Sequence, residues 1–253
     1  MNYIQTIEDT IRIIRTTKLV WVFGFLSLLG TLNQPLLQLL RSDSLLICIY
    51  LPVSFAFLYF SFIAGGGLIY VIYQKTLGRD LSFSDVWLRS KSKIFSVIGS
   101  SIPGIILAII VYMVLTYVLQ NSPFFWIIGF IAGSFIGSFF TFSACAIMIN
   151  DVKAGAAIWT GFLIAVNNFF RVLIITGTVY LIRLLLTGLV LIILLLFGYP
   201  TNQSIMGIPV AQTAVWVFYL VLIFPASVFL TLGYLRFTEE ISYPALSIKQ
   251  NAA

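Results

Sequence analysis

Residues 172–198 have the sequence VLIITGTVYLIRLLLTGLVLIILLLFG, a run of 27 residues in which Arg183 is the only charge. A helix needs about 20 consecutive apolar residues to cross the hydrocarbon core of a bilayer, so this stretch is long enough to span a membrane. The composition extends that conclusion to the whole chain, because 60% of the 253 residues are hydrophobic and only 9% are charged. Soluble domains carry about 25% charged residues. The sequence therefore predicts a polytopic membrane protein.

Hydropathy along the chain predicts an all-α bundle of about six transmembrane helices. The expected spans are 19–40, 45–73, 94–119, 123–149, 172–198 and 209–235. We expect residues 1–253 to form a single transmembrane domain that ends in a short cytoplasmic tail at 238–253.

The lysines and arginines predict the orientation of these spans. Twelve of the fourteen bases fall in segments on the same side of the predicted spans. They are Arg12, Arg15, Lys18, Lys75, Arg79, Arg89, Lys91, Lys93, Lys153, Arg171, Arg236 and Lys249. The other two are Arg41, on the opposite side, and Arg183, inside a span. Basic residues concentrate in cytoplasmic segments, so we expect an inner-membrane protein with both termini in the cytoplasm.

Three segments on the cytoplasmic side are predicted to be amphipathic helices that lie against the membrane. The first, Thr6 to Thr17, places isoleucines at helical spacing, with its charges elsewhere on the helix. The second begins at Ser82 with a Ser-x-x-Asp pattern, which is typical of a helix start. The third, Ala154 to Phe170, is more apolar and is either interfacial or partly re-entrant. Alternatively, the three segments are loops whose bases only follow the topology rule.

Arg89, Lys91 and Lys93 follow the second of these segments directly. Each base near an anionic bilayer contributes about 1 kcal/mol of attraction. We therefore predict that these three side chains contact lipid headgroups.

The starts of alternate spans resemble one another. Residues 18–24, 93–99 and 171–177 each begin with a base and end with a glycine, at offsets of 75 and 78. The pattern predicts a threefold repeat of a surface helix and two spans over 1–75, 76–150 and 151–237. Such repeats occur in transporters and in proteins that transport nothing, so the repeat does not decide the function.

Small residues predict close helix packing. Gly129, Gly133 and Gly137 recur every fourth residue, a pattern that lets another helix approach closely, either within the bundle or in a dimer. The run 65–67 of three glycines and the Pro103-Gly104 pair are expected to mark unwound segments of the kind that form transporter sites.

Arg183 is the candidate ligand site. It lies twelve residues after Arg171, about 18 Å along a helix, and no acid lies inside any predicted span to neutralise it. An intramembrane charge marks a functional site by default. Two alternatives remain open: Arg183 binds an anion or a lipid headgroup, or it is a structural arginine bonded to carbonyls and hydroxyls.

The missing residue types argue against catalysis. The chain has no histidine, which removes Ser-His and Cys-His nucleophiles and histidine metal sites. The two cysteines, Cys48 and Cys145, form no Cys-x-x-Cys pair, and there is no phosphate-binding loop and no pair of acids at membrane depth. We therefore expect no enzyme activity, no metal, no cofactor and no nucleic-acid partner.

Several short motifs carry a family resemblance. Residues 18–24 (KLVWVFG), residues 78–85 (GRDLSFSD) and residues 157–159 (AIW) followed by Asn167 resemble six-span bacterial and archaeal proteins related to the membrane domain attached to some glycerophosphoryl diester phosphodiesterases. That resemblance implies a helical inner-membrane bundle with no established reaction. The soluble phosphodiesterase domain is absent from this sequence, so its activity is not implied.

The expected function is that of a non-catalytic accessory or scaffold subunit that binds membrane lipids, other membrane proteins or further copies of itself. The alternative is a small transporter or permease-like subunit that moves an anionic or amphipathic solute past Arg183. A transporter predicts a continuous polar cavity between the repeats. An accessory protein predicts a filled core and an exposed apolar face.

Overall fold

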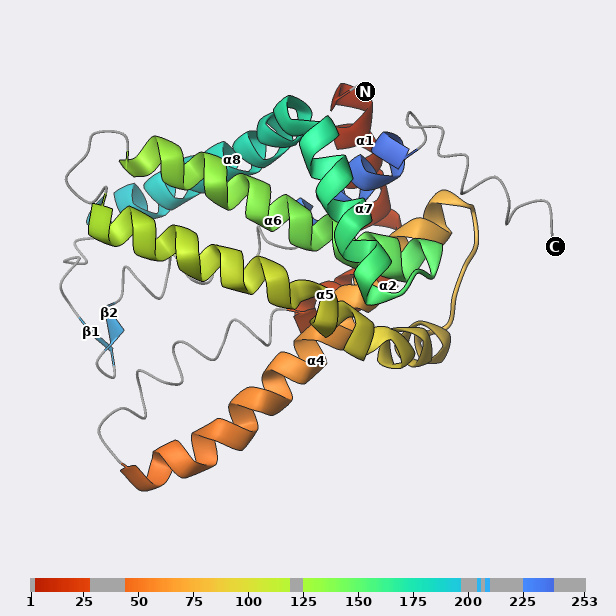
Figure 1. The fold of residues 1–253 in the computed structure, drawn as a ribbon, viewed down its shortest axis with the longest axis horizontal. Helices are drawn as coiled ribbons and strands as arrows, with labels where there is room; N and C mark the ends of the chain where they lie inside the picture. Colours follow the sequence, from red (N-terminus) through yellow and green to blue (C-terminus); the bar gives the residue numbers. More distant parts are fainter. Residues whose placement is uncertain are drawn as a thin grey trace.

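The computed structural model describes residues 3–27, 44–118, 125–196, 204–205, 208–209 and 225–238. The helices with labels in Figure 1 are α1 (Tyr3–Thr16), α2 (Lys18–Ser27), α4 (Ser44–Thr76), α5 (Phe83–Val118), α6 (Phe125–Asn150), α7 (Ala154–Asn167) and α8 (Phe169–Leu196). Residues 225–238 form a further helix, drawn in blue. The two-residue strands β1 (Ser204–Ile205) and β2 (Ile208–Pro209) pair in antiparallel fashion.

Three helices of the described part are long and apolar enough to cross a membrane. They are Pro52–Thr76 of α4, Phe83–Tyr117 of α5 and Ile128–Asn150 of α6. A fourth crossing is added if α7 and the Phe169–Val179 part of α8, which meet at an angle of 89°, count as one bent span. The chain is thus of the helical membrane class that the sequence predicts. The number of six spans stays a prediction, because most of 19–40 and of 209–235 lies outside the described residues.

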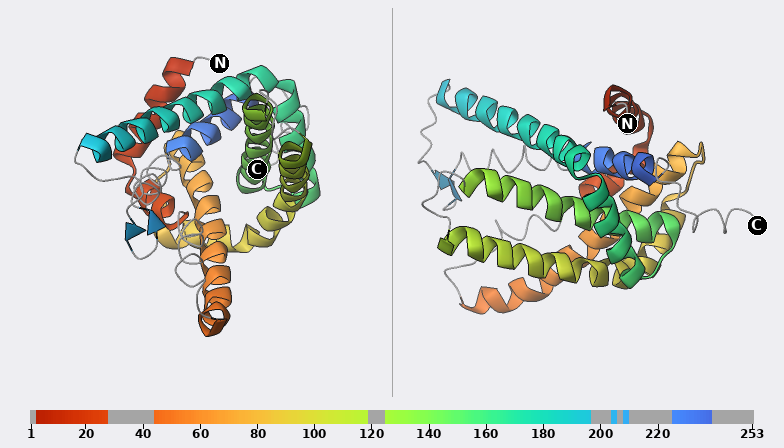
Figure 2. Two further views of the ribbon diagram at one scale, coloured as in Figure 1. Left: turned by 90° about the vertical axis from the view of Figure 1, so that its left-hand side faces the viewer. Right: turned by 45° about the horizontal axis from the view of Figure 1, so that its top comes forward.

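The predicted surface segments are helical. Figures 1 and 2 show α5, α6 and α8 side by side, with α1 and α7 running across their direction. The predicted start of the second segment is confirmed: Ser82 Oγ accepts the Asp85 N–H at 3.2 Å and donates to Asp85 Oδ2 at 2.6 Å. From there α5 continues without a break into the predicted span. The threefold repeat itself stays a prediction.

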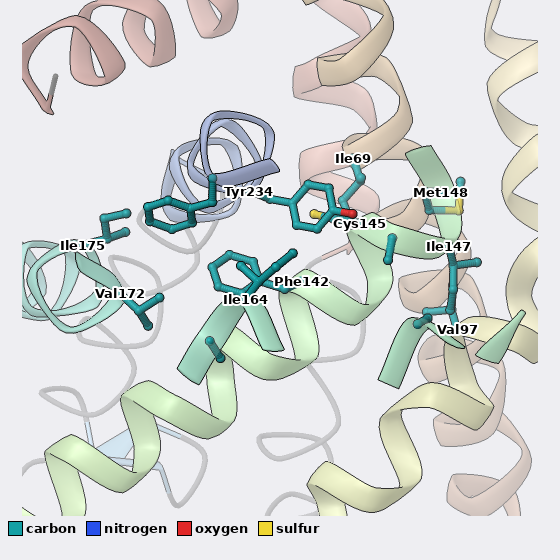
Figure 3. Packing of buried hydrophobic residues seen from close by; sticks show 14 of the residues in the cluster. Ile69, Val97, Phe142, Cys145, Ile147, Met148, Ile164, Val172, Ile175 and Tyr234 are labelled. Atoms are coloured by element: carbon teal, nitrogen blue, oxygen red, sulfur yellow. The ribbon is translucent and has the colours of Figure 1, made fainter. Parts of the chain in front are cut away.

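Helix α6 lies at the centre of the larger buried cluster. Phe142, Cys145 and Met148 of α6 are fully buried, and the thiol of Cys145 is free. Figure 3 shows Phe142 and Cys145 facing Tyr234 of helix 225–238, whose ring centroid lies 6.0 Å from that of Phe142. The Tyr234 hydroxyl accepts a hydrogen bond of 2.8 Å from Asn150 Nδ2. The C-terminal helix is therefore fixed to α6 by apolar burial and by one polar contact at its edge.

A second cluster joins α2, α4 and α5 through aromatic rings. The ring of Phe23 stacks on Phe83 at 5.2 Å, Phe83 stacks on Trp87 at 5.8 Å, and Trp87 stacks on Phe60 at 6.0 Å. Phe23 fits against Gly67, where an added Cβ would lie 2.5 Å from its ring.

The glycines of these helices do not break them, contrary to our expectation. Helix α4 is continuous through the 65–67 run, and α5 is continuous through Pro103 and Gly104. At Gly104 an added Cβ would lie 2.6 Å from the ring of Phe140. The missing side chains at Gly67 and Gly104 therefore leave room for aromatic rings. The prediction of unwound segments is wrong, because both helices are continuous.

Helices α6 and α7 approach each other closely at Gly161. An added Cβ there would meet Ser143 Oγ and would lie 2.9 Å from Ser143 N and 3.1 Å from Phe139 O. Two of these atoms belong to the backbone of α6 and cannot rotate away. Gly161 therefore sets the spacing between the two helices, in the manner of small residues at membrane helix contacts.

We predict that Gly161→Ala lowers the melting temperature of the protein in detergent. Overpacking costs about 1–3 kcal/mol, which outweighs the gain of about 1 kcal/mol from replacing a helical glycine by alanine. Gly155→Ala is the control in the same helix, because an added Cβ there meets no described atom within 4 Å. It should leave the melting temperature unchanged or slightly higher. Equal effects of the two substitutions would contradict the close approach at Gly161.

Candidate functional site

A glycine turn closes the C-terminal end of α4 and folds the chain back over it. Gly78 has φ of +71°, in the region that favours glycine. Its N–H donates to Lys75 O and the Arg79 N–H donates to Gln74 O, both at 3.0 Å, which is the bond pair of a Schellman motif. The turn places Arg79 and Asp80 beside the helix end, where Lys75 Nζ lies 2.8 Å from Asp80 Oδ1.

Asp9 attaches α1 to helix 225–238. One of its carboxylate oxygens accepts a hydrogen bond from Arg12 and the other accepts one from Arg236, both at 2.6 Å. The side chains of Asp9 and Arg236 are 22% and 19% exposed, so the pair is mostly removed from water. The two residues are 227 positions apart. This ion pair therefore joins opposite ends of the described chain.

A cavity of about 600 Å³ lies between α1, the end of α4 and helix 225–238. Its charged lining residues are Asp9, Arg12, Lys75 and Arg236. The hydroxyl-bearing side chains of Thr16, Tyr73 and Thr76 also line it. Three bases against one acid give the lining a net positive charge, so the cavity favours anions.

A smaller cavity of about 140 Å³ lies at the junction of α1 and α2. Lys18, Lys75, Arg79 and Asp80 are its charged lining residues. Lys75 and Thr16 line both cavities, which are therefore neighbours. Together they bring five bases and two acids to one region.

The opposite flank of α1 is apolar. The buried residues Thr6, Thr10 and Ile13 form the inward face of the helix, while Ile4, Ile7 and Ile11 are exposed. A groove of about 260 Å³, bordered by Ile7, Ile11, Val179, Pro225 and Phe229, runs between α1, α8 and helix 225–238. Helix α1 therefore lies between an apolar groove on one flank and a basic cavity on the other.

The predicted headgroup residues of α5 do not share one environment. Arg89 lies 3.3 Å from Asp151, and Lys93 also pairs with Asp151. Arg89 additionally lies over the ring of Tyr70, 5.8 Å from its centroid. Lys91 is exposed and makes no ion pair with any described residue. Of the three predicted headgroup contacts, only Lys91 is thus unpaired.

The other predicted site residues are the glycines of α6 and Arg183. An added Cβ at Gly129 would lie 3.4 Å from Leu115 of α5, whereas at Gly133 and Gly137 it would meet no atom of a described residue within 4 Å. The predicted packing stripe is thus in contact at one of its three positions. Arg183 lies on α8, and its side chain is outside the described residues.

The sequence alone does not identify the residues that line the two cavities. The rule that basic residues concentrate in cytoplasmic segments already accounts for the bases among them, namely Lys18, Lys75, Arg79 and Arg236. Nothing in the sequence therefore distinguishes these bases as lining residues. Only the Gly78 turn beside Arg79 and Asp80 hints that the chain folds back at this point.

Among the described residues, no three His, Cys, Asp or Glu side chains lie close enough together to hold a metal ion. Comparison with known proteins finds no matching family model, no matching curated protein and no matching solved structure. The resemblance to the phosphodiesterase-associated membrane domain therefore stays a prediction.

We predict that Asp9→Asn loosens α1 from the bundle. A hydrogen bond to a charged group contributes about 1.5–3 kcal/mol, and the lower end applies because Asp9 and Arg236 are about one-fifth exposed and Arg12 is mostly exposed. The open population should rise about tenfold, since 1.4 kcal/mol is a factor of about ten. Maleimide labelling of Thr10→Cys, at a buried position, measures that population once Cys48 and Cys145 are replaced.

Glu8→Gln is the matched control for this experiment, because Glu8 is the exposed neighbour of Asp9. It removes the same charge and should leave the labelling rate of Thr10→Cys unchanged. Faster labelling in both variants would assign the effect to net charge and would contradict the role of Asp9.

Proposed function

We propose that this protein is a non-catalytic, multi-pass protein of the inner membrane, an accessory or scaffold subunit that binds anionic lipid at its cytoplasmic face. The observation that carries the proposal is the position of α1, whose apolar flank borders the 260 Å³ groove and whose charged flank borders the 600 Å³ cavity. A helix at a membrane surface has this division, with apolar side chains toward the hydrocarbon and charges toward water.

Helix α7 supports the same arrangement. It meets α8 at 89° and exposes Trp159, Phe162 and Val166, which are spaced along one face. Tryptophan and phenylalanine on such a face are typical of membrane interfaces. Two helices that cross the direction of the spans would thus both be in contact with lipid.

The long helices favour an accessory protein over a transporter. The core around α6 is filled by apolar side chains, with Phe142, Cys145 and Ile147 fully buried. Most of α5, by contrast, turns large apolar side chains outward, among them Ile105, Ile109 and Met113. A filled core with an exposed apolar face suits a subunit that binds lipid tails or another membrane protein.

The charge of the cytoplasmic face supports anionic lipid as the ligand. The two neighbouring cavities carry five bases and two acids among their lining residues. Attraction to an anionic leaflet amounts to about 1 kcal/mol per base near the surface. A net positive charge of about three would therefore give an anionic headgroup a much higher binding affinity than a zwitterionic one.

We predict that the purified protein retains phosphatidylglycerol in preference to phosphatidylcholine of the same acyl chains when the two are supplied in equal amounts. Native mass spectrometry in mild detergent should show at least a fivefold excess of the anionic lipid. The excess should shrink at high salt, because the Debye length falls from about 10 Å at 0.1 M to about 3 Å at 1 M. Equal retention of the two lipids would contradict the proposed function.

We predict that both termini and the segment from Lys75 to Lys93 face the cytoplasm, as the distribution of bases requires. Lys91 is exposed, so Lys91→Cys should react with an impermeant maleimide only after the cells are opened. Asn121→Cys, on the predicted outer side, should react in intact cells. The reverse pattern would overturn the orientation.

A further inference from the structure

The small cavity at the α1–α2 junction gathers charges from three separate segments. Lys18 is the first residue of α2, Lys75 lies in the last turn of α4, and Arg79 follows the Gly78 turn. All three line a cavity of about 140 Å³. The convergence depends on the fold, because α2 and the end of α4 are about sixty residues apart in the sequence.

The acids leave most of this charge uncompensated. Lys75 pairs with Asp80, whose side chain is 88% exposed, and a surface pair of this kind contributes about 0–1 kcal/mol. Lys18 and Arg79 make no ion pair with any described residue. The lining therefore holds three bases against one weakly held acid.

The backbone adds further polar groups on the same side. Helix α2 begins at Lys18, so the partial positive charge of its N-terminus is at the cavity, where it meets the partial negative charge of the C-terminal ends of α1 and α4. The hydroxyl of Thr17, a lining residue, is buried and has no hydrogen-bond partner among the described residues. A helix start flanked by bases is a common arrangement for binding phosphate.

The size of the cavity suits one small anion. A volume of about 140 Å³ equals that of four or five water molecules at about 30 Å³ each. A phosphate group has five heavy atoms, so the cavity has room for one. The adjoining cavity of about 600 Å³ has room for whatever the phosphate carries.

We propose that Lys18, Lys75 and Arg79 form a binding site for a single phosphate group at the start of α2. The inference rests on the proposed function and names the chemistry that the cytoplasmic face recognises. Arg79 supplies a planar guanidinium that matches two phosphate oxygens, and the lysines act as point charges. The phosphate belongs either to an anionic phospholipid or to a soluble phosphate compound, and the experiment separates the two sources.

The test uses the full chain in mild non-ionic detergent. The melting temperature is measured against increasing phosphatidylglycerol in the micelles, and separately against inorganic phosphate, with chloride holding the ionic strength constant. The variants are Lys18→Gln and Arg79→Gln. Both residues are exposed, so neither substitution disturbs the core. Lys91→Gln is the matched control, because it removes the charge of an exposed base that lines neither cavity.

Phosphatidylglycerol should raise the melting temperature of the wild type and of Lys91→Gln. The apparent affinity should be about fivefold weaker in each site variant, which corresponds to about 1 kcal/mol per base, and about 25-fold weaker in the double variant. The same rise with inorganic phosphate assigns the site to soluble phosphates. A rise with the lipid alone assigns it to a headgroup.

Equal losses of affinity in Lys91→Gln and in the site variants would overturn the site while leaving the lipid preference of the whole face intact. The absence of any rise in the wild type with either probe would overturn the site as well. The failure of the proposed function is a different result, namely equal retention of anionic and zwitterionic lipid by the wild type in the mass-spectrometry experiment.

Discussion

The hydrocarbon core of a membrane offers a polypeptide no hydrogen-bond partner, and the rest of this structure depends on that constraint. Each backbone N–H and C=O at that depth has to be satisfied within the chain, so the long apolar segments form helices. Polar side chains within them bond to their own helix, as when Ser143 Oγ donates to Phe139 O at 2.8 Å. Apart from Arg183 in α8, the charges lie in the short α1 helix, in the turns or near the ends of the long helices, as with Asp80 after α4 and Asp151 after α6.

The same constraint explains why glycines set the spacing of the helices. Lipid tails are as apolar as leucine, so burial of apolar area gives helices little reason to associate, and close contact has to supply the attraction. Gly161 brings the backbones of α6 and α7 together, and Gly67 admits the ring of Phe23. At Gly133 and Gly137 the approach is equally open, yet no described atom occupies it. A small residue thus permits contact without determining that contact occurs.

Local features of the fold could be predicted from the sequence, whereas long-range charge pairing could not. The helix start at Ser82 follows from its own four-residue pattern and was confirmed by two hydrogen bonds to Asp85. Helices α4, α5 and α6 could be predicted because each contains an apolar run long enough to cross a membrane. The Asp9–Arg236 pair links residues 227 positions apart. Asp151 pairs with Arg89 and Lys93, whose presence in the sequence is already accounted for by the rule that basic residues concentrate on one side of a membrane. Such pairs depend on which helix ends become neighbours, and hydropathy does not contain that information.

The few acids therefore determine which bases of the described residues remain without an ion pair. Asp9 pairs with two arginines, Asp80 with one lysine, and Asp151 with one arginine and one lysine. Among the described residues these three acids engage at least five bases. The Asp9 pair joins α1 to helix 225–238, and the Asp151 pairs join α5 to the turn between α6 and α7. Lys18, Arg79 and Lys91 make no ion pair in the described part of the chain. Lys91 projects alone, but Lys18 and Arg79 converge on one cavity. A base that neither fixes a helix nor meets an acid has water or an anion as its partner, and two such bases in one cavity favour the anion.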